Sequence, residues 1–141
     1  MKYVVLVSHG DFATGLKTSL DMLAGKRDDV IAVGLPDGKT ADEFALMFKE
    51  GIQAVTADDE IILLADIVGG SPLTTSLNVL ADEGKLANTI TIGGMNLPLA
   101  LTSVLMKDSL DKETFTATVV SEAKAALQEF KLEQPEEDDE I

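Results

Sequence analysis

The sequence predicts an α/β fold with a doubly wound parallel sheet, and two patterns carry this prediction. Short runs rich in β-branched residues alternate with longer segments of helical period, which is typical of a sheet covered by helices on both faces. The first run, residues 3–7, is apolar throughout, as in a strand buried on both sides. With 141 residues, 45% of them hydrophobic, the chain is long enough for one domain with a single core.

Five short apolar runs are expected to form the strands. In chain order they occupy residues 3–7, 30–35, 61–65, 89–92 and 115–120. The fifth run holds Phe115 and several β-branched residues, a composition that favours strands. The third run ends at Asp66, a charge that the interior of a parallel strand would not tolerate, so we expect this side chain to have a use.

Between these runs, apolar residues recur at intervals of three and four, as an amphipathic helix requires. The first helix is expected at residues 14–24. The second begins at Thr40, which has the capping-box spacing to Glu43. The third begins at Ser71 and Pro72, a cap residue followed by the one helical position where proline fits. Two further helices are expected at 98–105 and 121–132.

The charged residues are unevenly distributed along the chain. There are 25 Asp and Glu against 11 Lys and Arg, a formal net charge of −14, and six of the acids lie within residues 133–141. Such a segment predicts a solvated, disordered tail or the start of a linker, so we place the domain at residues 1–132 and the tail at 133–141. Because the surface repels phosphate backbones, nucleic acid is not an expected partner.

Cysteine is absent from the chain, which excludes disulfides, cysteine-bound zinc and thiol nucleophiles. No apolar run approaches the ~18 to 20 residues that a membrane span requires. We therefore expect a cytoplasmic protein that is not itself a membrane protein.

In a doubly wound sheet, ligands bind beyond the carboxyl ends of the strands, where the strand order reverses. The first strand ends in Ser8, His9 and Gly10, and the third ends at Asp66. In the flavodoxin-like order 2-1-3-4 these two strands are neighbours. His9 and Asp66 would then face each other at the expected site.

His9 is the only histidine, and a lone histidine is more often structural than chemical. Its position reverses that reading, because a nearby carboxylate can hold one ring nitrogen as N–H and leave the other as a nucleophile. Asp66 taken alone could equally be a helix cap. Gly69, Gly70 and Ser71 offer backbone N–H groups and a hydroxyl at a helix N-terminus, which suits a phosphoryl group.

Together these residues describe phosphoryl transfer better than acyl transfer. A serine protease would need Ser8 or Ser71 as its nucleophile, in a geometry that nothing in the sequence suggests. We expect neither a metal nor a cofactor, although the composition leaves a carboxylate-bound magnesium open.

Three segments carry a family resemblance: VLVSHG at 5–10, LLADIVGGSP at 63–72 and GGMNLP at 93–98. Together they resemble the enzyme IIA component of mannose-family sugar phosphotransferase systems, and the match covers about residues 1–132. The resemblance implies that His9 accepts a phosphoryl group from the phosphocarrier protein HPr and passes it to a histidine of the enzyme IIB component. It also implies a homodimer in which the subunits exchange an antiparallel fifth strand.

The resemblance further implies a role for each site residue. Asp66 would orient His9, and Gly69, Gly70 and Ser71 would hold the phosphoryl oxygens. Val68 stands where some members carry an aromatic residue, a departure that concerns partner contacts and not the chemistry.

Three rival functions use the same region of the chain. A phosphoryl donor subunit for a dihydroxyacetone kinase shares the Ser-His start but differs in the second motif. A histidine phosphatase needs a second histidine and an arginine clamp, whereas His9 is the only histidine and Arg27 the only arginine. A response-regulator receiver would use Asp66 as phosphoryl acceptor and needs paired acids after the first strand, where Ser8 and His9 stand instead.

Overall fold

Four parallel strands form one sheet in the order β2-β1-β3-β4, which confirms the predicted α/β topology. The computed structural model describes residues 1–133. Its elements are, in chain order, β1 Lys2–His9, α1 Phe12–Ala24, β2 Val30–Leu35, α2 Ala41–Gly51, β3 Glu60–Ala65, α3 Ser71–Asp82, the short 3₁₀ helix η1 Leu86–Asn88, β4 Thr89–Ile92, α4 Leu97–Met106 and α5 Lys112–Ala125.

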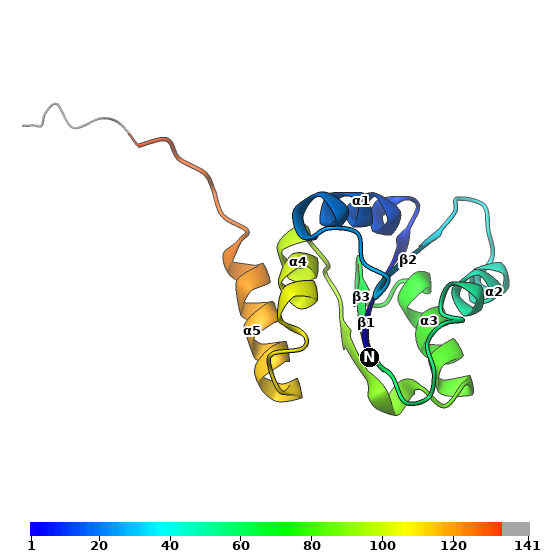
Figure 1. Ribbon diagram of the computed structural model, residues 1–141. Helices are drawn as coiled ribbons and strands as arrows, with labels where there is room; N and C mark the ends of the chain where they lie inside the picture. The colour runs from blue at the N-terminus through cyan, green and yellow to red at the C-terminus, as the bar shows by residue number, and fades with distance from the viewer. Residues whose placement is uncertain (134–141) are drawn as a thin grey trace, which may run out of the picture.

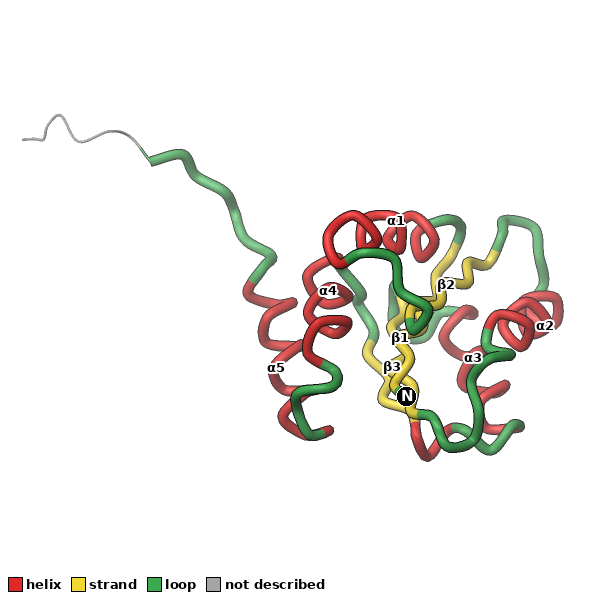
Figure 2. Tube along the Cα trace, viewed as in Figure 1, coloured by secondary structure: helices red, strands yellow, loops and turns green. Residues whose placement is uncertain are grey.

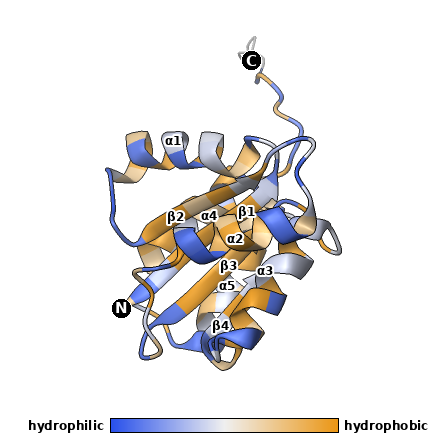
Figure 3. Ribbon diagram, turned by 90° about the vertical axis from the view of Figure 1, so that its right-hand side faces the viewer, coloured by the Kyte–Doolittle hydropathy of each residue, from blue (hydrophilic) through white to orange (hydrophobic). Residues whose placement is uncertain are grey.

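The helices divide between the two faces of the sheet (Figure 1). On one face α2 and α3 pack over Val5 and Val7 of β1, with Phe44 and Phe48 fully buried between the layers. On the other face α1, α4 and α5 pack over Val4 and neighbouring strand residues. The central strands are therefore apolar on both sides, as the hydropathy colouring in Figure 3 shows. This two-sided burial is why β1 has no alternation of polar and apolar residues.

The capping residues predicted at the starts of the helices are confirmed in part. At α2 the Thr40 hydroxyl accepts from the Glu43 amide at 3.1 Å, and the Glu43 carboxylate accepts from the Thr40 amide at 2.8 Å, so the capping box is present. At α3 the cap residue is Gly70 and Ser71 is already helical, one residue earlier than predicted. Because the cap residue is a glycine, no side chain at that position caps the helix, and the exposed Ser71 is available for another use.

The prediction of a fifth strand at 115–120 is wrong, because this segment belongs to helix α5. Asp111 caps the helix by accepting from the Thr114 amide at 2.9 Å. Phe115 and Val119, four residues apart, both point into the core. Capping and burial at helical spacing thus override the strand preference of the β-branched residues.

Beyond α5 the described chain runs clear of the domain, as Figure 2 shows. The prediction of a helix at 121–132 is therefore also wrong for the residues after Ala125, where α5 ends. The acidic tail predicted for 133–141 lies, from residue 134 on, outside the described residues. Among residues 1–133, none of the helices has the length and apolar composition needed to cross a membrane.

Candidate active site

The carboxyl ends of β1 and β3 bring together the two residues singled out in the sequence. His9 is the last residue of β1, and Asp66 directly follows β3. Val7 pairs with Ala65 in the register of these strands, and the Asp66 amide donates to the Val7 carbonyl at 3.2 Å. The sheet itself therefore fixes the separation of the His9 and Asp66 backbones.

Asp66 binds His9 through two hydrogen bonds that share one carboxylate oxygen. Oδ2 accepts from the His9 backbone amide at 2.9 Å and lies 2.8 Å from the ring Nδ1. The other oxygen, Oδ1, accepts from the Ile67 amide at 2.9 Å. The Asp66 side chain is 16% exposed and that of His9 48%, so the carboxylate is largely enclosed while the imidazole is open to an incoming group.

The electrostatics of the pair determine which ring nitrogen is free. Partial burial raises the pKa of Asp66, but hydrogen bonds from the His9 amide, the His9 ring and the Ile67 amide outweigh it and hold that pKa below its ordinary value. Asp66 is therefore ionised at neutral pH. Because an ionised carboxylate only accepts, Nδ1 is the donor, and a neutral ring keeps its lone pair on Nε2.

Ser8 has a role that the sequence analysis missed. Its side chain is fully buried, its hydroxyl accepts from the Ala13 amide at 2.7 Å, and the same hydroxyl donates to the Gly10 carbonyl at 3.4 Å. Ser8 thus ties the turn after His9 to the start of α1 instead of acting as a nucleophile. A serine beside the histidine, at the end of a buried strand, was the signal for this role.

The glycine-rich turn before α3 lies beside the imidazole. Gly69 has a φ of +85°, a left-handed conformation that favours glycine, and Gly70 approaches the His9 ring. Ser71 follows at the first turn of α3 and is exposed. All five site residues predicted from the sequence therefore lie at the carboxyl end of the sheet.

The surroundings of His9 are shallow and partly apolar. A pocket of about 260 Å³ lies between the imidazole and the β2–α2 turn, where Pro36 and Lys39 are among its lining residues. Phe12, Ile67 and Val68, all close to site residues in the chain, expose much of their apolar surface. Within residues 1–133 no three His, Asp or Glu side chains are grouped so that they could hold a metal ion.

Comparison with known proteins gives consistent results. Residues 3–120 match the family EIIA-man, described as "PTS system fructose IIA component". The fructose-specific EIIA component of Bacillus subtilis is 26% identical over 107 residues, which cover 76% of this chain and 71% of that protein. The mannose-specific EIIAB component of Escherichia coli is 22% identical over 105 residues, 74% of this chain but only 32% of that protein.

Two solved structures have the same fold. A PTS IIA protein associated with a fucose utilization operon of Streptococcus pneumoniae superposes with a TM-score of 0.77 at 27% identity, covering 91% of this chain and 92% of that one. A mannose/sorbose-specific IIA subunit from Enterococcus faecalis gives a TM-score of 0.79 at 18% identity, covering 96% and 99%.

Proposed function

The chain belongs to the EIIA-man family of phosphotransferase-system components, and we propose that it is a phosphocarrier in sugar uptake driven by phosphoenolpyruvate. His9 receives a phosphoryl group from phosphorylated HPr and passes it to a histidine of an enzyme IIB component. One observation carries this proposal: the imidazole is half exposed and its Nδ1 is bound to Asp66, while Nε2 has no hydrogen-bond partner among residues 1–133. The protein acts in the cytoplasm and serves a membrane transporter.

The proposed transfer balances without a metal. The lone pair on Nε2 attacks phosphorus, the Nε2–P bond forms, and the N–P bond to the donor histidine breaks, returning its electron pair to the donor ring. The His9 ring keeps its hydrogen on Nδ1, so the phosphorylated imidazole carries positive charge beside Asp66. The Asp66 carboxylate stabilises that charge because its lowered pKa keeps it ionised.

The amino end of α3 supplies the groups for the phosphoryl oxygens. Backbone N–H groups in the first turn of a helix have no partner within it and attract anions. Gly69, Gly70 and Ser71 stand at this end, and Gly70 lies next to the His9 ring. We assign them to binding the oxygens of the transferred group, with the hydroxyl of the exposed Ser71 as a further donor.

The apolar side chains near His9 fit a protein partner. Transfer between two histidines requires that the donor and acceptor proteins cover the imidazole and exclude water. Phe12, Ile67 and Val68 expose apolar area at this surface. HPr and enzyme IIB would bind there in turn, with Val68 replacing the aromatic contact of some relatives.

The rival acceptor within the site is Asp66, and its contacts oppose that function. Both carboxylate oxygens already accept hydrogen bonds, two from His9 and one from Ile67. A receiver-type acceptor must instead present a free oxygen to phosphorus. A donor subunit for a dihydroxyacetone kinase would use the same chemistry on His9 and differ only in the acceptor protein.

We also propose a homodimer, with a different pairing segment from the one predicted. Strand β4 lies at the sheet edge, with one side unpaired among residues 1–133. In the extended segment after α5, Leu127, Phe130 and Leu132 are each at least 80% exposed, a costly arrangement for an isolated subunit. The segment 127–132 of a second copy would add to the edge of β4.

Phosphorylation of the whole chain tests the function. The protein is incubated with phosphoenolpyruvate, enzyme I and HPr, and mass spectrometry detects the mass of one added phosphoryl group. His9→Ala should abolish this labelling, since the chain has no second histidine. Labelling of His9→Ala, or magnesium-dependent labelling of Asp66, would contradict the assignment. Adding enzyme IIB or a dihydroxyacetone kinase to the labelled protein then identifies the acceptor.

Sedimentation tests the dimer separately. The wild-type chain should sediment as a dimer at micromolar concentration, and Phe130→Glu should weaken the association by placing a charge in the interface. A strict monomer for the wild-type chain would contradict the dimer without affecting the proposed chemistry.

A further inference from the structure

Three glycines at the carboxyl end of the sheet lack a conformational reason to be glycine. Gly34, Gly70 and Gly93 do not have a positive φ, unlike Gly69. For Gly70 the backbone angles are φ −81° and ψ 163°, which any residue adopts. The reason for glycine at these positions must therefore be steric.

Each of the three leaves space that another part of the site occupies. A Cβ on Gly34 would collide with the Gly10 carbonyl in the turn after His9. A Cβ on Gly93 would collide with the Val68 side chain. A Cβ on Gly70 would lie 2.8 Å from Cε1 of the His9 imidazole, and the next nearest atoms, in Ile67, would be at 3.2 and 3.3 Å.

We propose that Gly70 is a positioning residue for His9, because the imidazole rests in the space where a side chain at position 70 would be. The hydrogen bond from Nδ1 to Asp66 fixes one atom of the ring but leaves the ring free to tilt about that bond. Contact with Gly70 supplies the second constraint. Cε1 lies between the two ring nitrogens, so displacing it moves Nε2 as well as Nδ1.

The consequence concerns the direction of attack. Transfer of a phosphoryl group requires the attacking and leaving atoms to be roughly in line, and a misplacement of about 1 Å can cost on the order of 10²-fold in rate. A ring held only by Asp66 would sample orientations that point Nε2 away from the donor. Gly70 thus orients the nucleophile in addition to the anion-binding role proposed above.

The test compares two glycine-to-alanine substitutions whose added Cβ would lie at the same distance from its nearest neighbour. At Gly70 the added Cβ would lie 2.8 Å from His9 Cε1, and at Gly51 it would lie 2.8 Å from Val33 Cγ2, in a core contact outside the site. Gly70→Ala should lower the rate of phosphoryl transfer from HPr by on the order of tenfold to 10²-fold. Gly51→Ala should lower Tm and leave the rate per folded molecule unchanged.

A second readout does not depend on the proposed function. Because His9 is the only histidine, labelling with ¹⁵N-histidine gives one pair of ring nitrogen signals that report the tautomer and the bond to Asp66. Gly70→Ala should shift this pair and Gly51→Ala should not. Ring signals identical to wild type in Gly70→Ala would overturn the inference. If instead the wild-type chain takes up no phosphoryl group, the proposed function fails and the ring signals still decide this inference.

A double-mutant cycle covers the case in which Gly70→Ala folds poorly. Removing the ring with His9→Ala leaves only the Ile67 contacts at 3.2 and 3.3 Å, so Gly70→Ala should lower Tm more in the wild-type background than in the His9→Ala background. An equal loss of Tm in both backgrounds would mean that the ring does not occupy the space, and would equally overturn the inference.

Discussion

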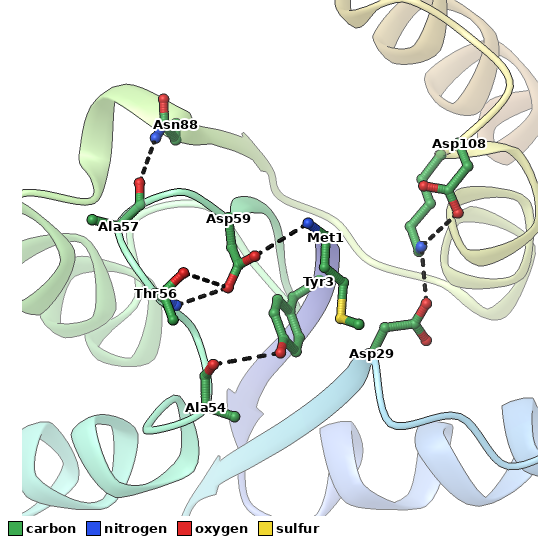
Figure 4. Close-up of polar contacts among 10 residues, drawn as sticks. Met1, Tyr3, Asp29, Ala54, Thr56, Ala57, Asp59, Asn88 and Asp108 are labelled. Carbon is green, nitrogen blue, oxygen red and sulfur yellow. Dashed lines mark hydrogen bonds and ion pairs between the residues drawn. The ribbon is translucent and has the colours of Figure 1, made fainter.

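The two ends of the sheet carry polar clusters of opposite design. At the amino end the ammonium of Lys107, which is only 2% exposed, contacts Asp29 and Asp108 at 2.9 Å each, and both carboxylates are visible in Figure 4. Arg27 binds both oxygens of Asp29 at 2.9 Å. At the carboxyl end His9 is half exposed, with one ring nitrogen bound and the other open.

The two clusters differ in whether their polar groups all have partners among the described residues. Lys107 sits where α4 ends, and its carbonyl accepts from Lys2 of β1 at 2.9 Å, so the amino-end cluster joins a helix to two strands. Its charges compensate one another, as buried charges must. At the other end both oxygens of Asp66 accept hydrogen bonds, whereas only one nitrogen of the His9 ring is bound among residues 1–133. Paired charges hold the chain together, and the atom left without a partner is available for chemistry.

After the loss of His9 itself, the largest effect is expected from Asp66→Asn at the carboxyl end. An amide has no negative charge to stabilise the phosphorylated ring, and its NH₂ group can turn toward Nδ1 and change the tautomer. Transfer to His9 should slow by about 10²-fold or more, with the fold kept. Initial rates of labelling from HPr and Tm measure the two effects.

The matched control for this substitution lies at the amino end. Asp59 also accepts hydrogen bonds from a backbone amide, that of Thr56, and binds the amino group of Met1. Asp59→Asn makes the same chemical change there and should leave the rate unaltered. Equal rates for Asp66→Asn and wild type would show that the carboxylate does not orient the ring.

Lys107→Met should reverse the pattern, with a loss of stability and no loss of transfer. The substitution leaves Asp29 and Asp108 without their shared cation, but Asp29 keeps Arg27. We therefore expect a loss of about 2 kcal/mol in the free energy of unfolding, below the ~3 to 5 kcal/mol of breaking an isolated buried pair. Urea denaturation measures it, with the exposed Lys131→Met as control. A slower rate of labelling per folded molecule would show that the two ends of the sheet are coupled, and would contradict their independence.

The clusters also differ in how far the sequence predicts them. The carboxyl end follows from topology, because the strand order places the carboxyl ends of β1 and β3 side by side. Asp66 directly follows one apolar run, and His9 follows another with only Ser8 between. The amino-end cluster was not predicted, since Lys107 looks like any lysine at a helix end until α4 and β2 are packed together. The contact between Gly70 and the His9 ring could not be predicted for a similar reason. A sequence shows that glycine has no side chain, but it does not show which group occupies the space.

The error at 115–120 has a related cause. Its β-branched residues favour a strand locally, but the cap at Asp111 and the burial of Phe115 and Val119 decide for a helix. Local preference of this kind spans about 1 kcal/mol, which is less than the burial of one large apolar side chain.

Acid unfolding offers a smaller test of the amino-end cluster. The hydrogen bond from Arg27, opposed by burial and assisted by Lys107, lowers the pKa of Asp29 from 3.8 to about 2. A carboxyl group with a lowered folded-state pKa contributes stability above its unfolded value and loses it as the pH falls. The contribution of Asp29, at most about 2 to 3 kcal/mol, should be complete above pH 3.8 and disappear toward pH 2.

Asp29→Asn isolates this contribution from those of other carboxylates. Asp59 and Asp111 also have lowered pKa values, so the stability of the variant still falls in acid. The difference in unfolding free energy between variant and wild type should shrink as the pH is lowered from 3.8 to about 2. A difference that does not depend on pH over this range would mean that the cluster does not hold Asp29 in its charged form.

The smallest effect is expected from removing residues 133–141. Their composition of six acids without a base offers almost no apolar area to offset the entropy of ordering them, and removing them changes the net charge from −14 to −8. Tm and labelling of His9 should both remain at wild-type values. A truncation after Ala126, which also removes Leu127, Phe130 and Leu132, is the informative partner: it should abolish the dimer in sedimentation while both clusters keep their contacts. A substantial fall in Tm on removing only 133–141 would place a stabilising contact in the tail, outside the two ends of the sheet compared above.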